Sequence, residues 1–155
     1  METLDGTVLA HEFFAGLDPE FGKLIAGCAR NQHFEPGAYL VHQGDPAREF
    51  YVVRYGEVAL EISSPGRKTV VLRTIHDGEI VGGSWLAAPY RWTADARAKT
   101  HVHAIGFDAE SLRAKCEEDP RIGYELLKRF TTVVLNRLET AYLQLLDMYG
   151  RTEET

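Results

Sequence analysis

Short apolar runs separated by glycine turns occupy the middle of the chain, from Phe34 to Gly83. The glycines that punctuate them are Gly37, Gly44, Gly56, Gly66 and Gly78. In one run Val58, Leu60 and Ile62 share one side of an extended chain, while Glu61 lies on the other. This alternation predicts a strand with one buried and one solvent-exposed side. Regular short strands with such turns are typical of a sandwich or barrel. The pattern predicts two antiparallel sheets.

Helical patterns flank this region on both sides. Two short amphipathic helices are expected before it, the second capped by Asp18 with Pro19 in its first turn. After it we expect a short helix from Asp108 and a long one that begins at Asp119 and Pro120 and ends near Tyr149. The predicted organisation is one domain, 1–149, with N-terminal helices at 8–30, a β-roll at 31–107, C-terminal helices at 108–149 and a frayed polar tail at 150–155.

Apolar residues in the long helix recur at alternating steps of three and four: Leu135, Leu138, Tyr142, Leu145 and Tyr149. This is the spacing of a coiled-coil seam, so we expect these five residues to form a homodimer interface. The alternative is that they pack on the protein's own body. A second stripe, made of Leu127, Phe130 and Val134, is expected to face the β-roll.

A glycine-rich segment follows the predicted strands. Gly82 and Gly83 allow the backbone to approach a ligand closely, and Ser84 is a candidate N-cap for a short helical turn. Free N–H groups at such a turn attract anions. Arg91, which follows, offers a planar guanidinium for a phosphate or carboxylate. The segment therefore has the layout of an anion-binding loop.

Three stretches in combination resemble the cyclic nucleotide-binding domain of the catabolite activator and kinase regulatory-subunit superfamily. They are FEPGAYLVHQGDPAREFYVVRYGEVAL at 34–60, GEIVGG at 78–83 and ARAKT at 96–100. The resemblance implies a mainly β fold with flanking helices, a double-stranded β-helix (a jelly-roll-like β-roll) with N-terminal helices and a long C-terminal helix. It also implies a phosphate-binding cassette between Gly82 and Ala94, and pairing of two chains through the long helix.

The cassette departs from the family pattern at three positions. Gly83 stands where the family has a glutamate for the ribose, and Trp92 stands where it has the phosphate-binding arginine, with Arg91 one residue earlier. Asp95 places a carboxylate where a threonine or serine is common. The residues of this degenerate cassette are Gly82, Gly83, Ser84, Arg91, Trp92, Thr93 and Ala94. We therefore predict no cofactor and weak or no cyclic nucleotide binding. The alternative is a genuine cAMP or cGMP sensor that uses Arg91.

The two tryptophans, Trp85 and Trp92, are open to two interpretations. They can fill the space that a nucleotide would otherwise occupy, because indoles bury a large apolar area. They can also stack on a different planar ligand. The first interpretation leaves a non-enzymatic regulatory or sensor module that acts through its dimer or through a protein partner.

Composition and motifs exclude further classes of function. A formal net charge of −6 disfavours a nucleic-acid surface, and we expect no helix-turn-helix domain after the long helix. No apolar run is long enough for a membrane span and no signal peptide is evident, so we predict a cytoplasmic protein without membrane contact. Cys28 and Cys116 are expected to be buried, reduced thiols.

An enzyme is the remote alternative, because double-stranded β-rolls also host metal-dependent enzymes of the cupin type. His101 and His103 would point the same way from a strand, as two metal ligands do. Further ligands are not evident, since the other histidines fall at predicted turns. No nucleophile motif or P-loop is present either. We predict neither catalytic residues nor metal ligands.

Overall fold

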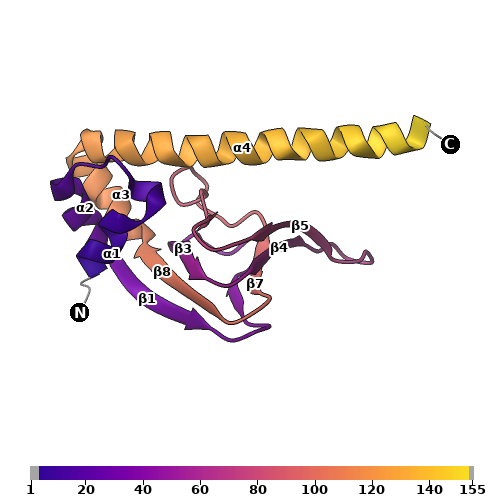
Figure 1. Cartoon of the computed structure of the whole chain (residues 1–155), viewed down its shortest axis with the longest axis horizontal. Coiled ribbons are helices and arrows are strands. Elements are labelled where there is room, and N and C mark those ends of the chain that lie inside the picture. The colour runs from indigo at the N-terminus through magenta and orange to yellow at the C-terminus, as the bar shows by residue number, and fades with distance from the viewer. Residues whose placement is uncertain (1–3, 154–155) are drawn as a thin grey trace.

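The computed structural model describes residues 4–153 and contains two four-stranded antiparallel sheets with helices packed at one end (Figure 1). One sheet has the strand order β1-β8-β3-β6 and the other β2-β7-β4-β5. The strands are β1 (Ala29–Phe34), β2 (Tyr39–Val41), β3 (Glu49–Tyr55), β4 (Val58–Ile62), β5 (Val70–Ile75), β6 (Ile80–Val81), β7 (Asp95–Ala98) and β8 (Val102–Asp108). Together they form the predicted β-roll, so the fold class is confirmed.

The apolar sides of the two sheets face each other and form the core, in which Val52, Val58, Ala96 and Ile105 are fully buried. One expectation about β4 is wrong. Glu61, which was expected on the solvent-exposed side, is only 5% exposed. The reason lies on β7, where the half-exposed Arg97 reaches across and donates to the Glu61 carboxylate at 2.6 Å, so the buried charge is paired.

The N-terminal helices cover one end of the roll. They are α1 (Leu4–Ala10), the 3-10 helix η1 (Glu12–Phe14) and α2 (Pro19–Ala26). Asp18 caps α2 as predicted, since its carboxylate accepts from the Glu20 N–H at 2.9 Å. The predicted boundaries are off at both ends, because α1 begins at residue 4 and the first strand already begins at Ala29.

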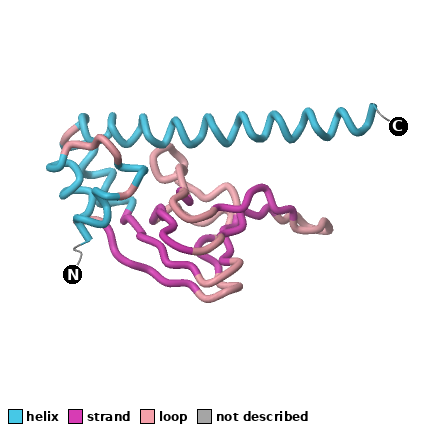
Figure 2. Tube along the Cα trace, viewed as in Figure 1, coloured by secondary structure: helices cyan, strands magenta, loops and turns pink. Residues whose placement is uncertain are grey.

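The C-terminal helices are α3 (Ala109–Glu118), capped by Asp108, and α4 (Pro120–Glu153). The chain beyond Tyr149 was expected to be a frayed tail, but α4 continues through Gly150 to Glu153. A glycine near a helix end weakens the helix only modestly. Figures 1 and 2 show that α4 starts beside the other helices, runs along the roll and extends past it.

The face of α4 that contacts the roll differs from the predicted stripe. Phe130 is buried, but Leu127 and Val134 are about half exposed. The residues turned inward are Ile122, Leu126, Phe130 and Val133. At steps of four, four and three, these residues fall on one side of a straight helix. Leu127 and Val134 lie farther around the helix from this side, so only Phe130 of the predicted stripe is buried.

Cys28 and Cys116 are free thiols, as predicted, but both are half-buried where full burial was expected. Partial burial raises the pKa of each thiol.

Within residues 4–153, no helix combines the length and the apolar character that crossing a bilayer requires.

Candidate functional site

The predicted cassette, residues 82–94, connects β6 to β7 and lies beneath α4 (Figure 1). It begins with two positions whose backbone conformation suits only glycine. Gly82 has φ of 141° and Gly83 has φ of 145°, a region that side chains with a Cβ rarely adopt. A glutamate at Gly83, where the family places its ribose contact, would be strained in this conformation.

The short helical turn expected after Ser84 is absent, and this prediction is wrong. Residues 84–89 form hydrogen-bonded turns and bends, with the Leu86 N–H donating to the Gly83 carbonyl at 3.3 Å. Pro89 disfavours helical dihedrals at Ala88, so too few residues remain between Gly83 and Pro89 to complete a helix. The loop therefore lacks the row of N–H groups that a helix N-terminus offers an anion.

Arg91 and Trp92 point to opposite sides. Exposure alternates from residue 91 to residue 98, with Arg91 on the exposed side and Trp92 on the buried side. The Arg91 guanidinium donates to the Gly44 carbonyl at 2.8 Å. Asp95, which could have paired with Arg91, instead accepts from the Gln43 N–H at 2.7 Å. Arg91 thus connects the loop at 42–46 to the cassette, and Asp95 connects the same loop to β7.

Trp92 occupies the inner side at the position where the family has its arginine. The indole is 7% exposed and approaches Gly82, where an added Cβ would lie 3.5 Å from the ring. It also lines a cavity of about 470 Å³ with Leu40, Val41, Asp45, Pro46, Arg48, Glu49 and Tyr51. Of the other predicted cassette residues, Ser84 is half-buried, Thr93 is exposed and Ala94 is buried.

Trp85 connects the cassette to α4, a contact that the sequence patterns did not predict. Its ring is 1% exposed, stacks on Phe50 at 5.0 Å and meets Phe130 of α4 edge-on at 5.5 Å. The Trp85 carbonyl accepts from Arg113 at 2.8 Å. The buried indole N–H has no partner among the described residues, which costs about 1–3 kcal/mol. Apolar packing therefore holds the ring against this cost.

A second contact joins α4 to the roll at β6. Arg137 donates through Nη2 to the Ile80 carbonyl, two residues before Gly82. Burial lowers the pKa of Arg137 to about 10, and the nearby charge of Arg73 acts in the same direction. Both arginines line a cavity of about 450 Å³ between α4, β5 and the N-terminal helices, together with Glu12, Phe13, Gly78, Glu79, Ile80, Arg129, Thr132, Val133 and Asn136.

Glu79 balances the positive charge in this cavity. It accepts from Arg73 at 2.8 Å and from the His76 N–H at 3.1 Å. Burial alone would raise the pKa of Glu79, but these hydrogen bonds and the charges of Arg73 and Arg137 outweigh burial and leave the pKa lowered. The sequence patterns did not predict that Arg73 and Arg137 line a cavity. The eight-residue spacing of Arg129 and Arg137 places both on one side of α4 and was the available signal for a charged site there.

A family model for the cyclic nucleotide-binding domain matches residues 31–119, more than half of the chain. The chain belongs to the cyclic nucleotide-binding domain family. The chain is similar to the solved structure of a putative cyclic nucleotide-binding protein from Geobacter metallireducens. The two are 29% identical, the match covers 89% of this chain and 99% of that one, and the TM-score is 0.78.

Curated relatives of the family are longer proteins. The human potassium/sodium hyperpolarization-activated cyclic nucleotide-gated channel 4 is 29% identical over 133 residues, which is 85% of this chain and 10% of the channel. The HTH-type transcriptional regulator Cmr of Mycobacterium tuberculosis is 28% identical over 127 residues, 82% of this chain and 50% of the regulator. The chain thus spans between a tenth and a half of these relatives.

Proposed function

We propose that this protein is a non-enzymatic regulatory module of the cyclic nucleotide-binding family that binds cyclic nucleotides weakly or not at all and acts through α4. The observation that carries the proposal is the buried Trp92, which takes the inner position of the cassette while Arg91 is turned outward to Gly44. The relatives named above, a gated channel and a transcriptional regulator, agree with a regulatory role.

Two missing contacts support weak nucleotide binding. Gly83 offers no carboxylate to a ribose, and Trp92 offers no positive charge to a phosphate. A hydrogen bond to a charged group is worth about 1.5–3 kcal/mol, so each missing contact weakens binding by roughly tenfold or more. The alternative, a cAMP or cGMP sensor that uses Arg91, requires this side chain to leave the Gly44 carbonyl and cross to the other side of the cassette.

Isothermal titration with cAMP and with cGMP tests the proposal. We expect no saturable heat up to millimolar nucleotide, and no change in the Arg91→Ala variant, because Arg91 does not face the cassette interior. Micromolar binding would contradict the proposal. If Arg91→Ala abolished that binding, the sensor alternative would replace it. Circular dichroism of both proteins checks that the variant is folded.

Support for action through α4 comes from its exposed apolar side. The five seam residues Leu135, Leu138, Tyr142, Leu145 and Tyr149 are each between 44% and 70% exposed. An exposed apolar stripe of this length usually marks a protein contact, and the spacing fits a second helix of the same kind. We therefore keep the homodimer as part of the proposal, with a different protein partner for the same stripe as the other possibility. A cytoplasmic location also stays a prediction.

The cassette is mechanically connected to this stripe. Trp85 of the cassette packs on Phe130, and Ile80 at its entrance accepts from Arg137, so two turns of α4 are docked on the segment that carries a ligand elsewhere in the family. The exposed seam begins at Leu135, between Phe130 and Arg137, and continues along α4 to Tyr149. A change in the cassette would therefore shift the direction of the seam.

A further inference from the structure

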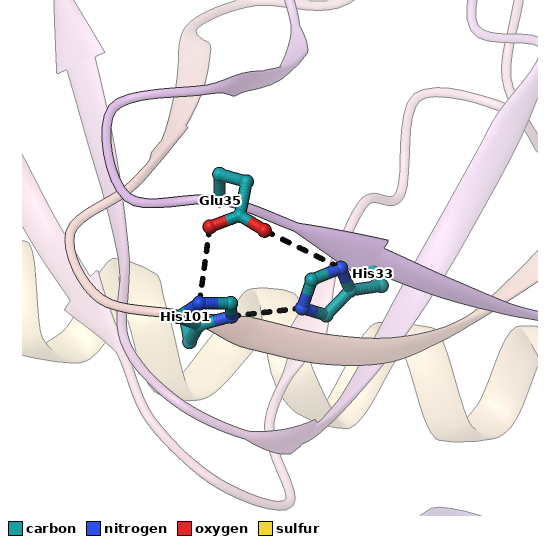
Figure 3. A group of neighbouring side chains, drawn as sticks. All are labelled: His33, Glu35 and His101. Carbon is teal, nitrogen blue, oxygen red and sulfur yellow. Dashed lines mark hydrogen bonds and ion pairs between the residues drawn. The ribbon is translucent and has the colours of Figure 1, made fainter.

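Two histidines and a glutamate meet on the outer face of the roll, where β1 ends and β8 begins. Figure 3 shows His33, Glu35 and His101 pointing toward one another from these two chain segments. All three side chains are exposed, and the cluster lies outside the cassette. The proposed regulatory role does not use these residues.

The strand register explains why residues so distant in sequence meet. Strands β1 and β8 are antiparallel, with His33 opposite His103 and Phe34 opposite Val102. Continuing this register by one step places Glu35 opposite His101. Side chains alternate between the two faces of a strand, so all these odd-numbered residues lie on one face, while the even-numbered Phe34 and Val102 turn inward.

The three side chains form a closed ring of polar contacts. His33 Nε2 lies 2.8 Å from His101 Nδ1, His101 Nε2 lies 3.0 Å from one Glu35 oxygen, and His33 Nδ1 lies 4.0 Å from the other. One ligand atom from each residue lies within 4.8 Å of the other two. In a tetrahedral zinc site, bond lengths near 2.0–2.2 Å set ligand atoms roughly 3.3 Å apart. The 4.8 Å limit for one ligand atom per residue lies above this value, so the side chains must rotate closer together to hold an ion.

We propose that His33, Glu35 and His101 bind a divalent transition-metal ion of the zinc type. Two imidazole nitrogens and one carboxylate oxygen suit zinc, nickel or copper, whereas calcium and magnesium prefer sites made of oxygen alone. The ion replaces the His33–His101 hydrogen bond, because a ring nitrogen that bonds to a metal no longer accepts a proton. Since the side chains are exposed, small rotations bring them to the required spacing.

The bound ion acts as a cross-link between two strand ends. It joins the end of β1 and the residue after it to the residue before β8, in addition to the backbone pairing of the two strands. A ligand that binds only the folded state stabilises it, and the stabilisation grows with the logarithm of the ligand concentration once this exceeds the Kd. The outward direction of the ligands sets this site apart from an enzyme centre buried inside a β-roll.

The test is isothermal titration of untagged, chelator-treated protein with zinc chloride. We expect one ion per chain, and an affinity about tenfold or more lower in His33→Ala and in His101→Ala. Two other exposed histidines serve as matched controls, because among the described residues neither belongs to a group of three potential metal ligands. The imidazole of His42 lies 3.8 Å from Asp95 and that of His76 lies 3.8 Å from Glu57. His42→Ala and His76→Ala should bind zinc like the unaltered protein.

Two results would overturn the proposal. One is the absence of zinc binding by the unaltered protein. The other is equal zinc affinity in all four variants, which would show that scattered surface histidines account for the binding. Because all four histidines are exposed, the variants are expected to fold, and far-ultraviolet circular dichroism verifies this before titration.

Discussion

Replacing Phe130 with alanine should lower the free energy of unfolding by about 3–5 kcal/mol, the usual cost of removing a fully packed phenyl ring. Phe130 is 3% exposed, and its ring meets those of Phe13 and Phe50 at 5.0 Å and that of Trp85 at 5.5 Å. It is therefore the residue of α4 where the N-terminal helices, the roll and the cassette come together. Denaturant unfolding followed by circular dichroism measures the loss.

Leu127→Ala is the matched control, since Leu127 lies one turn earlier on α4 and is 54% exposed. This variant should change the free energy of unfolding by no more than about 0.5 kcal/mol. Tryptophan fluorescence should shift in Phe130→Ala and not in Leu127→Ala, because Trp85 loses a neighbour only in the former. Equal stability loss in the two variants would show that α4 is not docked through Phe130.

The second large effect is expected at the entrance to the cassette. Gly82→Ala introduces a Cβ that would lie 2.7 Å from the Cβ of Phe50, a side chain with no exposed surface. A Cβ cannot rotate away from its own backbone, so β3 or the cassette must shift. Overpacking of this kind costs about 1–3 kcal/mol, in addition to about 1–3 kcal/mol of backbone strain at positive φ.

Gly83→Ala isolates the strain from the clash. Gly83 has nearly the same φ, but an added Cβ meets nothing within 4 Å. The difference in unfolding free energy between the two variants, measured in denaturant, should therefore be the overpacking cost alone, with Gly82→Ala the less stable. If the two variants were equally stable, the close approach of the cassette to Phe50 would not exist in solution.

The fold was predictable because its signals are local. Glycines at strand ends, the short apolar runs between them and the Asp18 cap each depend on a few neighbours in sequence. What the local patterns missed depends on partners far along the chain. Glu61 is buried because Arg97, 36 residues later, pairs with it, and no local alternation reveals such a partner.

The cassette was predictable in outline and not in its contacts. A one-residue step between Arg91 and Trp92 predicts opposite sides, and their exposures agree. The absence of a helix after Ser84 follows from Pro89, which disfavours helical dihedrals at Ala88. His33 was assigned to a turn but lies in β1, which is why its contacts with Glu35 and His101 were missed. The Trp85–Phe130 contact depends on how α4 crosses the roll.

The central claim, a regulatory module that works through α4 without a cyclic nucleotide, is tested most directly by sedimentation equilibrium with and without millimolar cAMP. The account predicts twice the chain mass at micromolar protein in both conditions, and a single-chain mass for the Leu138→Glu, Leu145→Glu double variant. A protein that is monomeric without cAMP and associates only when cAMP is added would contradict it.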